Sequence, residues 1–154
     1  MNAPKRAPLM SLDDALTALL SRVEPLRAVE PVATFDAAGR VLAQDLVSAL
    51  QVPPQDNSSM DGYAVRTADV TAPGTVLPVT QRIPAGHSGH ALQPGTCARI
   101  FTGAPMPEGA DAVVMQEDTR EVGGDFHAVH IDAAPRPGQW VRRSGEDVSR
   151  GDRV

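Results

Sequence analysis

The chain has 154 residues, with 14 Lys and Arg against 19 Asp and Glu, so its formal net charge is −5. Hydrophobic residues make up 42% and charged residues 21%, proportions of a globular chain that can bury its own core. An acidic chain with one cysteine and no apolar run near the ~20 residues of a membrane span argues against disulfide scaffolds, nucleic-acid binders and membrane proteins, and predicts a cytoplasmic location.

The first predicted element is a helix. Residues 1–10 are expected to form a disordered leader, and Ser11 can then cap the helix while the following Asp residues favour the positive end of its dipole. We interpret the helical stripe as core packing, and we expect Pro25 to end the helix. The stripe consists of Leu12, Ala15, Leu16, Leu19, Leu20 and Val23.

From the helix to the end of the chain, the pattern predicts short elements. A short element is expected around residues 36–42, followed by an extended stretch to Leu50 and a break at Pro53-Pro54. Beyond it, Gly or Pro separates short apolar runs, which is typical of a small β-barrel or sandwich. These runs are Tyr63–Val65, Val76–Val79, Cys97–Phe101, Ala112–Met115 and Val129–Ile131. No helix of about ten residues lies between them, so no parallel α/β unit is expected.

The tail, residues 141–154, alternates charged and apolar residues and ends like a turn into another strand. We therefore expect the natural protein to continue. The predicted fold class is mainly β with a short helical lobe (α+β).

Three polar stretches stand beside predicted strands: PQDNSSMDGYAVR at 54–66, RIFTGAPMPEGADAVVMQE at 99–117, and RRSGED at 142–147. The Asp56–Ser59 segment can form turns in which side chains bond the nearby backbone. Loops on a rigid β scaffold are common places for binding groups, but spacing alone favours plain turns over a site.

Together, the three stretches resemble the molybdopterin molybdenumtransferase family, called MoeA in bacteria and represented in animals by the C-terminal part of gephyrin. The resemblance runs from about residue 9 to the end of the chain and covers the family's first and second domains only. It implies an elongated N-terminal lobe made of residues 11–50 and 141–154, incomplete here, into which a β-rich domain of residues 51–140 is inserted.

The resemblance also implies an activity. Family members insert molybdenum from molybdate into adenylyl-molybdopterin with the help of Mg²⁺, and an upstream molybdopterin adenylyltransferase supplies the substrate. They are homodimers whose cleft has this β-rich domain as one wall. We therefore expect a full-length transferase of which this chain alone is inactive. The alternative is a non-catalytic dimerisation or scaffolding module of the same fold, and the choice between molybdenum and tungsten stays open.

The matching motifs imply specific site residues. Asp61, Thr102 and Asp147 occupy the family's functional positions, and the two carboxylates are candidate Mg²⁺ ligands because Mg²⁺ takes one or two carboxylates plus substrate oxygens. Weaker candidates for substrate binding are Arg66, Arg99, Arg142 and Ser59, although an Arg beside a carboxylate is more often a simple ion pair.

Two further signals are discounted. The pairs His87/His90 and His127/His130 lack the remaining ligands of a zinc site. Cys97, the single cysteine, is interpreted as a buried packing residue.

Overall fold

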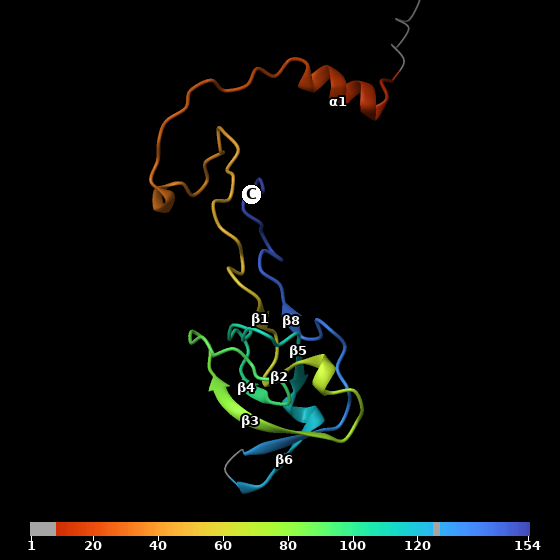
Figure 1. Cartoon of the computed structure of the whole chain (residues 1–154). Coiled ribbons are helices and arrows are strands. Elements are labelled where there is room, and N and C mark those ends of the chain that lie inside the picture. Colours follow the sequence, from red (N-terminus) through yellow and green to blue (C-terminus); the bar gives the residue numbers. More distant parts are fainter. Residues whose placement is uncertain (1–8, 125–126) are drawn as a thin grey trace, which may run out of the picture. The chain divides into compact units, whose positions relative to one another are not determined.

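The computed structural model describes residues 9–124 and 127–154 (Figure 1). The chain forms two compact units, Met1–Gln44 and Asp45–Val154. Most of the expected leader, residues 1–8, lies outside the described residues.

The first unit contains helix α1, Leu12–Leu20. As predicted, Ser11 caps the helix: its side-chain oxygen accepts a hydrogen bond from the backbone N–H of Asp14 at 3.1 Å. The helix ends at Leu20, before the predicted stop at Pro25. After it, the chain closes 3₁₀-type bonds between residues three positions apart, such as the one from the Arg22 N–H to the Leu19 carbonyl, 3.1 Å.

The apolar stripe of α1 is exposed. No residue of the helix is buried, and Leu12, Leu19 and Leu20 have exposed fractions of 75%, 65% and 69%. The interpretation of the stripe as core packing is therefore wrong for the described residues. The only other regular element of this unit, within the described residues, is the 3₁₀ helix η1, Thr34–Asp36, which is shorter than the element expected at residues 36–42.

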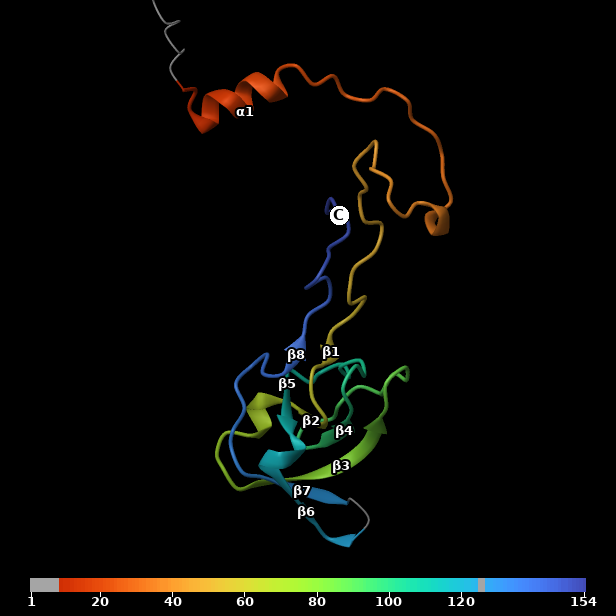
Figure 2. The same ribbon diagram turned by 180° about the vertical axis from the view of Figure 1, so that it is seen from behind.

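The second unit is built around a six-stranded sheet in the order β5-β2-β4-β3-β7-β6 (Figure 2). Its strands are β2 (Gly62–Val65), β3 (Thr75–Ile83), β4 (Cys97–Ile100), β5 (Ala112–Met115), β6 (Thr119–Val122) and β7 (Ala128–Ile131). The described chain is thus mostly β with one α-helix and a curled sheet, which confirms the predicted fold class.

Strands β2, β4 and β5 are buried on both faces of the sheet, whereas β6 is mostly exposed. Successive side chains of a strand point to opposite faces, and here they enter two different hydrophobic clusters. In β2, Tyr63 and Val65 join one cluster with Val129 and Ile131, whereas Ala64 joins the other. Two-sided burial explains why these strands read as continuous apolar runs rather than as alternating ones.

One strand pair departs from the antiparallel pattern. β3 and β4 pair in parallel, with Val79 opposite Cys97 and Ile83 opposite Ile100. The connection between them, residues 84–96, contains no helix. This connection packs against the sheet through Leu92, which is buried in the second cluster. Two 3₁₀ helices, η2 (Thr67–Asp69) and η3 (Gln116–Asp118), lie elsewhere between the strands.

Residues 45–58 and 141–154 run antiparallel and form a segment that we call the neck. Strand β1 (Asn57–Ser58) pairs with β8 (Val141–Arg142), and isolated bridges join Val47 to Arg153 and Val52 to Val148. Both views show the two segments side by side (Figures 1 and 2). The neck therefore brings residues near position 56 next to residues near position 143.

Candidate functional site

Asp61 and Thr102 lie at one edge of the sheet. Asp61 immediately precedes β2 and Thr102 follows the end of β4, and these strands are antiparallel with Gly62 opposite Ile100. The start of one strand therefore lies beside the end of the other. The Thr102 backbone N–H and hydroxyl both donate to Asp61 Oδ1, each at 2.8 Å.

These two bonds hold Asp61 as a carboxylate. The backbone N–H of Thr102, then its hydroxyl, lower the pKa of Asp61, and the positive charge of Arg99 adds to the effect. Within the described residues, Oδ2 of Asp61 has no hydrogen-bond partner. One carboxylate oxygen is thus fixed by the protein while the other remains available to a ligand.

The backbone at Asp61 is held by a close contact between strands. A Cβ added at Gly62 would lie 1.9 Å from the carbonyl oxygen of Val114 in β5, so only glycine fits there. The carbonyl of Asp61 also accepts the backbone N–H of Gln116 at 3.0 Å. The absence of a side chain at Gly62 lets β2 and β5 approach closely enough to fix the position of Asp61.

Arg99 lies against the same strand edge, between two aromatic rings. Its guanidinium donates to the Gly62 carbonyl at 3.0 Å and to Gln116 Oε1 at 2.6 Å. The guanidinium carbon lies 4.7 Å from the ring centre of Phe101 and 5.2 Å from that of Tyr63. Gln116, which was not predicted as a site residue, therefore contacts both Asp61 and Arg99. Its position in the second motif was the only available sequence signal.

A shallow cavity of about 460 Å³ adjoins Arg99. It is lined by Tyr63, Arg99, Gln116, Thr119, Arg120 and Glu121.

A second group of predicted residues lies at the neck. The Arg142 guanidinium donates to Asp147 Oδ2, and this bond, together with the carboxylate charge, raises the pKa of Arg142. The turn that carries Asp147 is fixed by its own backbone N–H, which donates to the Val52 carbonyl at 2.9 Å. Arg142 and Asp147 thus meet as an exposed ion pair.

Asp56 joins the two sides of the neck instead of bonding the nearby backbone, as its place in the predicted turn segment suggested. It accepts the Ser144 N–H at 2.8 Å and an Arg143 guanidinium N–H at 2.6 Å, and these partners lower the pKa of its carboxyl. Ser58 does form the predicted local turn, because its hydroxyl donates to the Met60 carbonyl at 2.6 Å. No local pattern in the sequence indicated the long-range bonds of Asp56.

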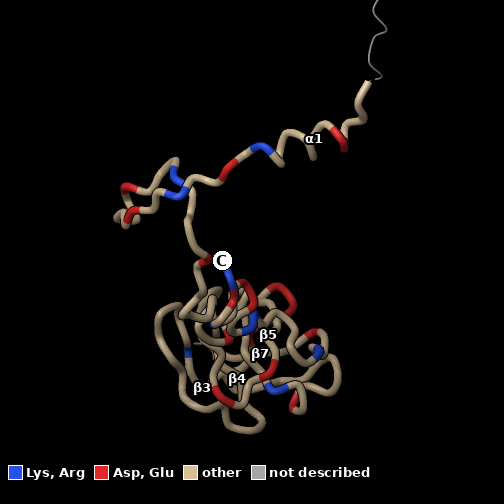
Figure 3. The backbone as a smooth tube through the Cα atoms, turned by 90° about the horizontal axis from the view of Figure 1, so that it is seen from above, with Lys and Arg blue, Asp and Glu red and all other residues tan. Residues whose placement is uncertain are grey.

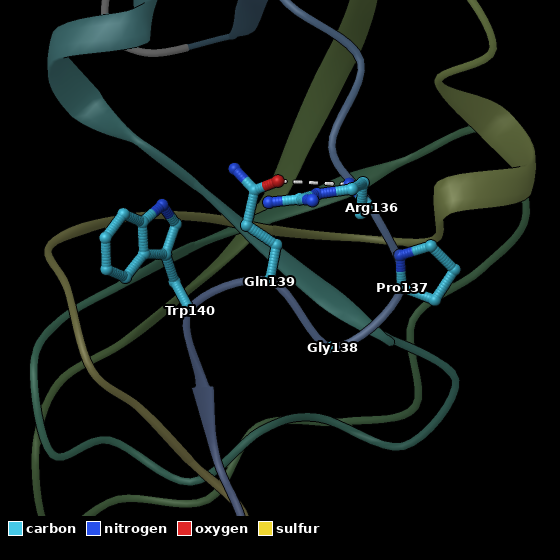
Figure 4. Close-up of a pocket in the computed structure, with 5 residues that line it drawn as sticks. All are labelled: Arg136, Pro137, Gly138, Gln139 and Trp140. Carbon is cyan, nitrogen blue, oxygen red and sulfur yellow. Dashed lines mark hydrogen bonds between the residues drawn. The ribbon is translucent and has the colours of Figure 1, made fainter.

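Ser59 fixes the loop before β8. Its backbone N–H and its hydroxyl both donate to the Trp140 carbonyl, at 3.0 and 2.9 Å. Trp140 has φ 55°, the only positive φ of a non-glycine residue in the described chain. It lines a cavity of about 520 Å³ with the preceding residues Arg136–Gln139 (Figure 4). Ser59, a predicted substrate-binding residue, thus has a structural partner.

The predicted residues therefore fall into two groups. Asp61, Thr102 and Arg99 form one, and Arg142 and Asp147 form the other. No hydrogen bond or ion pair within the described residues joins the two groups directly.

Basic and acidic positions lie interspersed along the second unit (Figure 3).

Arg66 joins neither group, since it lies at the other end of β2, 3.7 Å from Asp69. Asp69 also accepts the Gly95 N–H at 2.8 Å. For Arg66, a simple ion pair is what the structure contains.

The described residues contain no group of three or more His, Cys, Asp or Glu side chains that could hold a metal ion. Mg²⁺ prefers six oxygen ligands but commonly takes only one or two from the protein, with substrate oxygens and water supplying the others. The available Oδ2 of Asp61 fits that arrangement, whereas Asp147 already pairs with Arg142. No helix in the described part of the chain is long and apolar enough to span a bilayer.

A family model and curated relatives match this chain, and they agree with one another. A family model described as the MoeA N-terminal region (domain I and II) matches residues 10–154. Over 138 residues, the chain is 44% identical to molybdopterin molybdenumtransferase 2 of Mycobacterium tuberculosis, covering 85% of this chain and 33% of that protein. Over 147 residues, it is 40% identical to molybdopterin molybdenumtransferase of Haemophilus influenzae, covering 95% and 36%.

A solved structure agrees. The crystal structure of the molybdopterin biosynthesis moeA protein from Pyrococcus horikoshii matches with a TM-score of 0.80 and 33% identity, over 96% of this chain and 39% of that one. The chain spans about a third of the length of the curated relatives, 33% and 36%.

Proposed function

Because the chain belongs to the family of the MoeA N-terminal region, domains I and II, we propose that it supplies one wall of the active site of a molybdopterin molybdenumtransferase. The full-length enzyme inserts molybdenum from molybdate into adenylyl-molybdopterin, during molybdenum cofactor biosynthesis. The observation that carries this proposal is the pair of hydrogen bonds from Thr102 to Oδ1 of Asp61. They leave Oδ2 of an ionised carboxylate without a partner, at the position that the family motif marks.

In this proposal, Asp61 is the group that meets the substrate. Its Oδ2 orients a water molecule or a hydrated cation against the anionic substrate, while Thr102 holds Oδ1. The hydroxyl of Thr102 donates to Asp61, so the role of Thr102 in this proposal is to position the carboxylate.

Mg²⁺, when bound, neutralises negative charge on molybdate and on the phosphate bridge, which would otherwise repel a carboxylate. Asp61 is the ligand that this chain offers with an available oxygen. Asp147 becomes a second ligand only if Arg142 moves to the substrate anion, since the two side chains are paired in the structure. An exchange of this kind costs little, because exposed ion pairs contribute only about 0–1 kcal/mol.

Arg99 and Arg142 supply positive charge to this wall. Arg99 is already oriented by Gln116, Phe101 and the Gly62 carbonyl, so it acts as a fixed cation beside Asp61. Arg142 is the more exposed of the two and binds substrate oxygens in exchange for Asp147.

The wider assignments are also part of the proposal. We assign residues 11–50 and 141–154 to one lobe, into which residues 51–140 are inserted. The bridge from Val47 to Arg153, which joins the two segments of this lobe, supports the assignment. The enzyme is a cytoplasmic homodimer that receives adenylyl-molybdopterin from a molybdopterin adenylyltransferase. The chain on its own has no insertion activity.

A non-catalytic dimerisation or scaffolding module is the second candidate. The exposed apolar stripe of α1 favours it, because a helix with no buried residue has a surface available to another subunit. The two candidates differ in what they require of Asp61: a scaffold needs its fold, whereas an enzyme needs its charge.

The test is molybdenum insertion by the full-length protein, with adenylyl-molybdopterin, molybdate and Mg²⁺. Asp61→Asn should abolish insertion while folding and dimerisation persist. Asp45→Asn is the matched control, since it removes a carboxylate whose structural partner is the exposed Arg153. If Asp61→Asn inserts molybdenum as fast as the wild type, Asp61 takes no part in the reaction, and the scaffolding module becomes the better explanation.

A further inference from the structure

The cavity beside the neck contains a tryptophan whose side chain the fold does not bury. Trp140 is the only tryptophan of the chain and is 42% exposed. It lines the cavity with Arg136, Pro137, Gly138 and Gln139. In Figure 4, Trp140 and Gln139 project from the same stretch of loop, and the Arg136 side chain extends toward Gln139.

The backbone of Trp140 adopts a conformation that disfavours a bulky residue. Its φ of 55° lies in the left-handed region, which Gly and Asn enter far more readily than other residues do. The two hydrogen bonds from Ser59 to the Trp140 carbonyl fix this conformation without involving the indole. Glycine or asparagine would therefore suit this backbone better than tryptophan. We interpret the indole as a group that serves to contact a ligand rather than to stabilise the fold.

The groups that line the cavity together with the indole are those that bind a charged ring system. Within the described residues, Arg136 forms no ion pair, and its backbone N–H donates to Gln139 Oε1 at 3.1 Å. That bond orients the Gln139 amide and leaves its N–H₂ group as a donor. An aromatic face, a guanidinium and an amide together suit a planar heteroaromatic ring with an attached anion.

We propose that Trp140, Arg136 and Gln139 form a stacking site for the planar heteroaromatic ring of a phosphate-bearing ligand. The site lies close to the groups assigned to chemistry, because Trp140 is two residues from Arg142 and its carbonyl is bonded to Ser59, two residues from Asp61. This inference rests on the proposed function, whose substrate carries two such rings, a pterin and an adenine. Either ring fits the chemistry of the site.

The first experiment uses the fluorescence of Trp140, since no other tryptophan in the 154-residue chain contributes to the signal. The chain is titrated separately with adenosine monophosphate, with a pterin and with ribose 5-phosphate, which has no ring system. We expect saturable quenching by adenosine monophosphate, by the pterin or by both, and the ligand that quenches identifies the ring. Equal responses to ribose 5-phosphate, or none to any ligand, would overturn the stacking site.

Variants separate ligand binding from a structural role, with affinity measured by calorimetry. Trp140→Asn should weaken ring binding about tenfold, the scale of one base stacked on an aromatic side chain, while the thermal midpoint stays level or rises. Trp140→Phe keeps a ring and should retain most of the affinity. Phe35→Asn is the control, because Phe35 is fully exposed in the other unit. A lower midpoint with unchanged affinity in Trp140→Asn would show that the indole only supports the fold.

Insertion assays on the full-length protein then distinguish the two proposals. If Trp140 binds a substrate ring, Trp140→Asn should raise KM about tenfold with little change in kcat, since it removes uniform binding. Loss of insertion in Asp61→Asn without any effect of Trp140→Asn would reject the stacking site and keep the proposed function. Ring binding by Trp140 with normal insertion in Asp61→Asn would reject the proposed function instead.

Discussion

Asp61 accepts both hydrogen-bond donors of Thr102 on a single carboxylate oxygen, although 41 positions separate the two residues. The pairing depends on the register between β2 and β4, which places the start of one strand beside the end of the other. Both donors lower the pKa of Asp61, the backbone N–H more than the hydroxyl.

Removing only the hydroxyl should therefore raise the pKa of Asp61 part of the way to its ordinary value. In Thr102→Val, the backbone N–H still donates, so the carboxylate keeps its stronger partner. We expect the acid limb of the insertion pH profile to move to higher pH, and the Asp61 carboxyl to titrate at higher pH by NMR. Thr102→Ser keeps the hydroxyl and should titrate as the wild type does. Identical titration in the valine variant would show that the hydroxyl does not act on Asp61.

Asp56 should make folding stability depend on pH in the acid range. Its pKa is lowered in the folded state, first by the Ser144 N–H and then by Arg143. The unfolded chain therefore binds the proton more readily, so the stabilisation is present above pH ~3.8 and is lost as the pH falls through the lower folded pKa. Urea unfolding from pH 6 to pH 2 measures it.

Asp56→Asn should reduce this dependence and lower the free energy of unfolding at pH 7 by about 1 kcal/mol, a modest value because solvent screens the partly exposed carboxylate. Unchanged acid sensitivity in the variant would mean that other carboxylates, such as Asp61, dominate.

Gly62→Ala should destabilise the second unit strongly. The new Cβ would lie 1.9 Å from the Val114 carbonyl oxygen, so β2 and β5 must separate. We expect a loss of about 2–4 kcal/mol, in the upper range for point substitutions, measured by urea unfolding. Gly124→Ala is the control, since a Cβ there meets nothing within 4 Å. Equal stability of the two variants would contradict the close approach of the strands.

Cys97 should be almost unreactive in the folded protein. Burial raises the pKa of its thiol to about 12, so the thiolate fraction at pH 8 is very small, and the side chain is fully buried. Alkylation by iodoacetamide should follow the rate at which the sheet opens, and should become fast in urea. Rapid modification without denaturant would show that the thiol is accessible.

The sequence was most informative where strands are buried on both faces. β5, at Ala112–Met115, has the predicted boundaries, because an apolar run between a charged loop and a polar turn leaves little choice. β6, at Thr119–Val122, was missed because three of its four residues are exposed and it carries Arg and Glu. Its pairing with β7, rather than its own composition, makes it a strand.

The partners of the site residues could not be predicted in the same way. The motifs marked Asp61, Thr102 and Asp147, but which donor meets which carboxylate depends on strand register and on the neck. Asp56 illustrates the difference: its local sequence indicates a turn, whereas its partners Arg143 and Ser144 are 87 and 88 positions away. Spacing rules describe neighbours along the chain, and these contacts join segments that are far apart in the sequence.

The neck has a consequence for the order in which the protein matures. Closing a loop of about 90 residues has a large entropic cost. Contacts between such segments therefore form late in folding, after local contacts have shortened the effective loop. During synthesis, residues 59–140 emerge from the ribosome before the second arm of the neck does. The sheet that holds Asp61 and Thr102 can therefore assemble first, and the pairing of β1 with β8 adds Asp147, Arg142 and the Trp140 loop to an already folded half of the site.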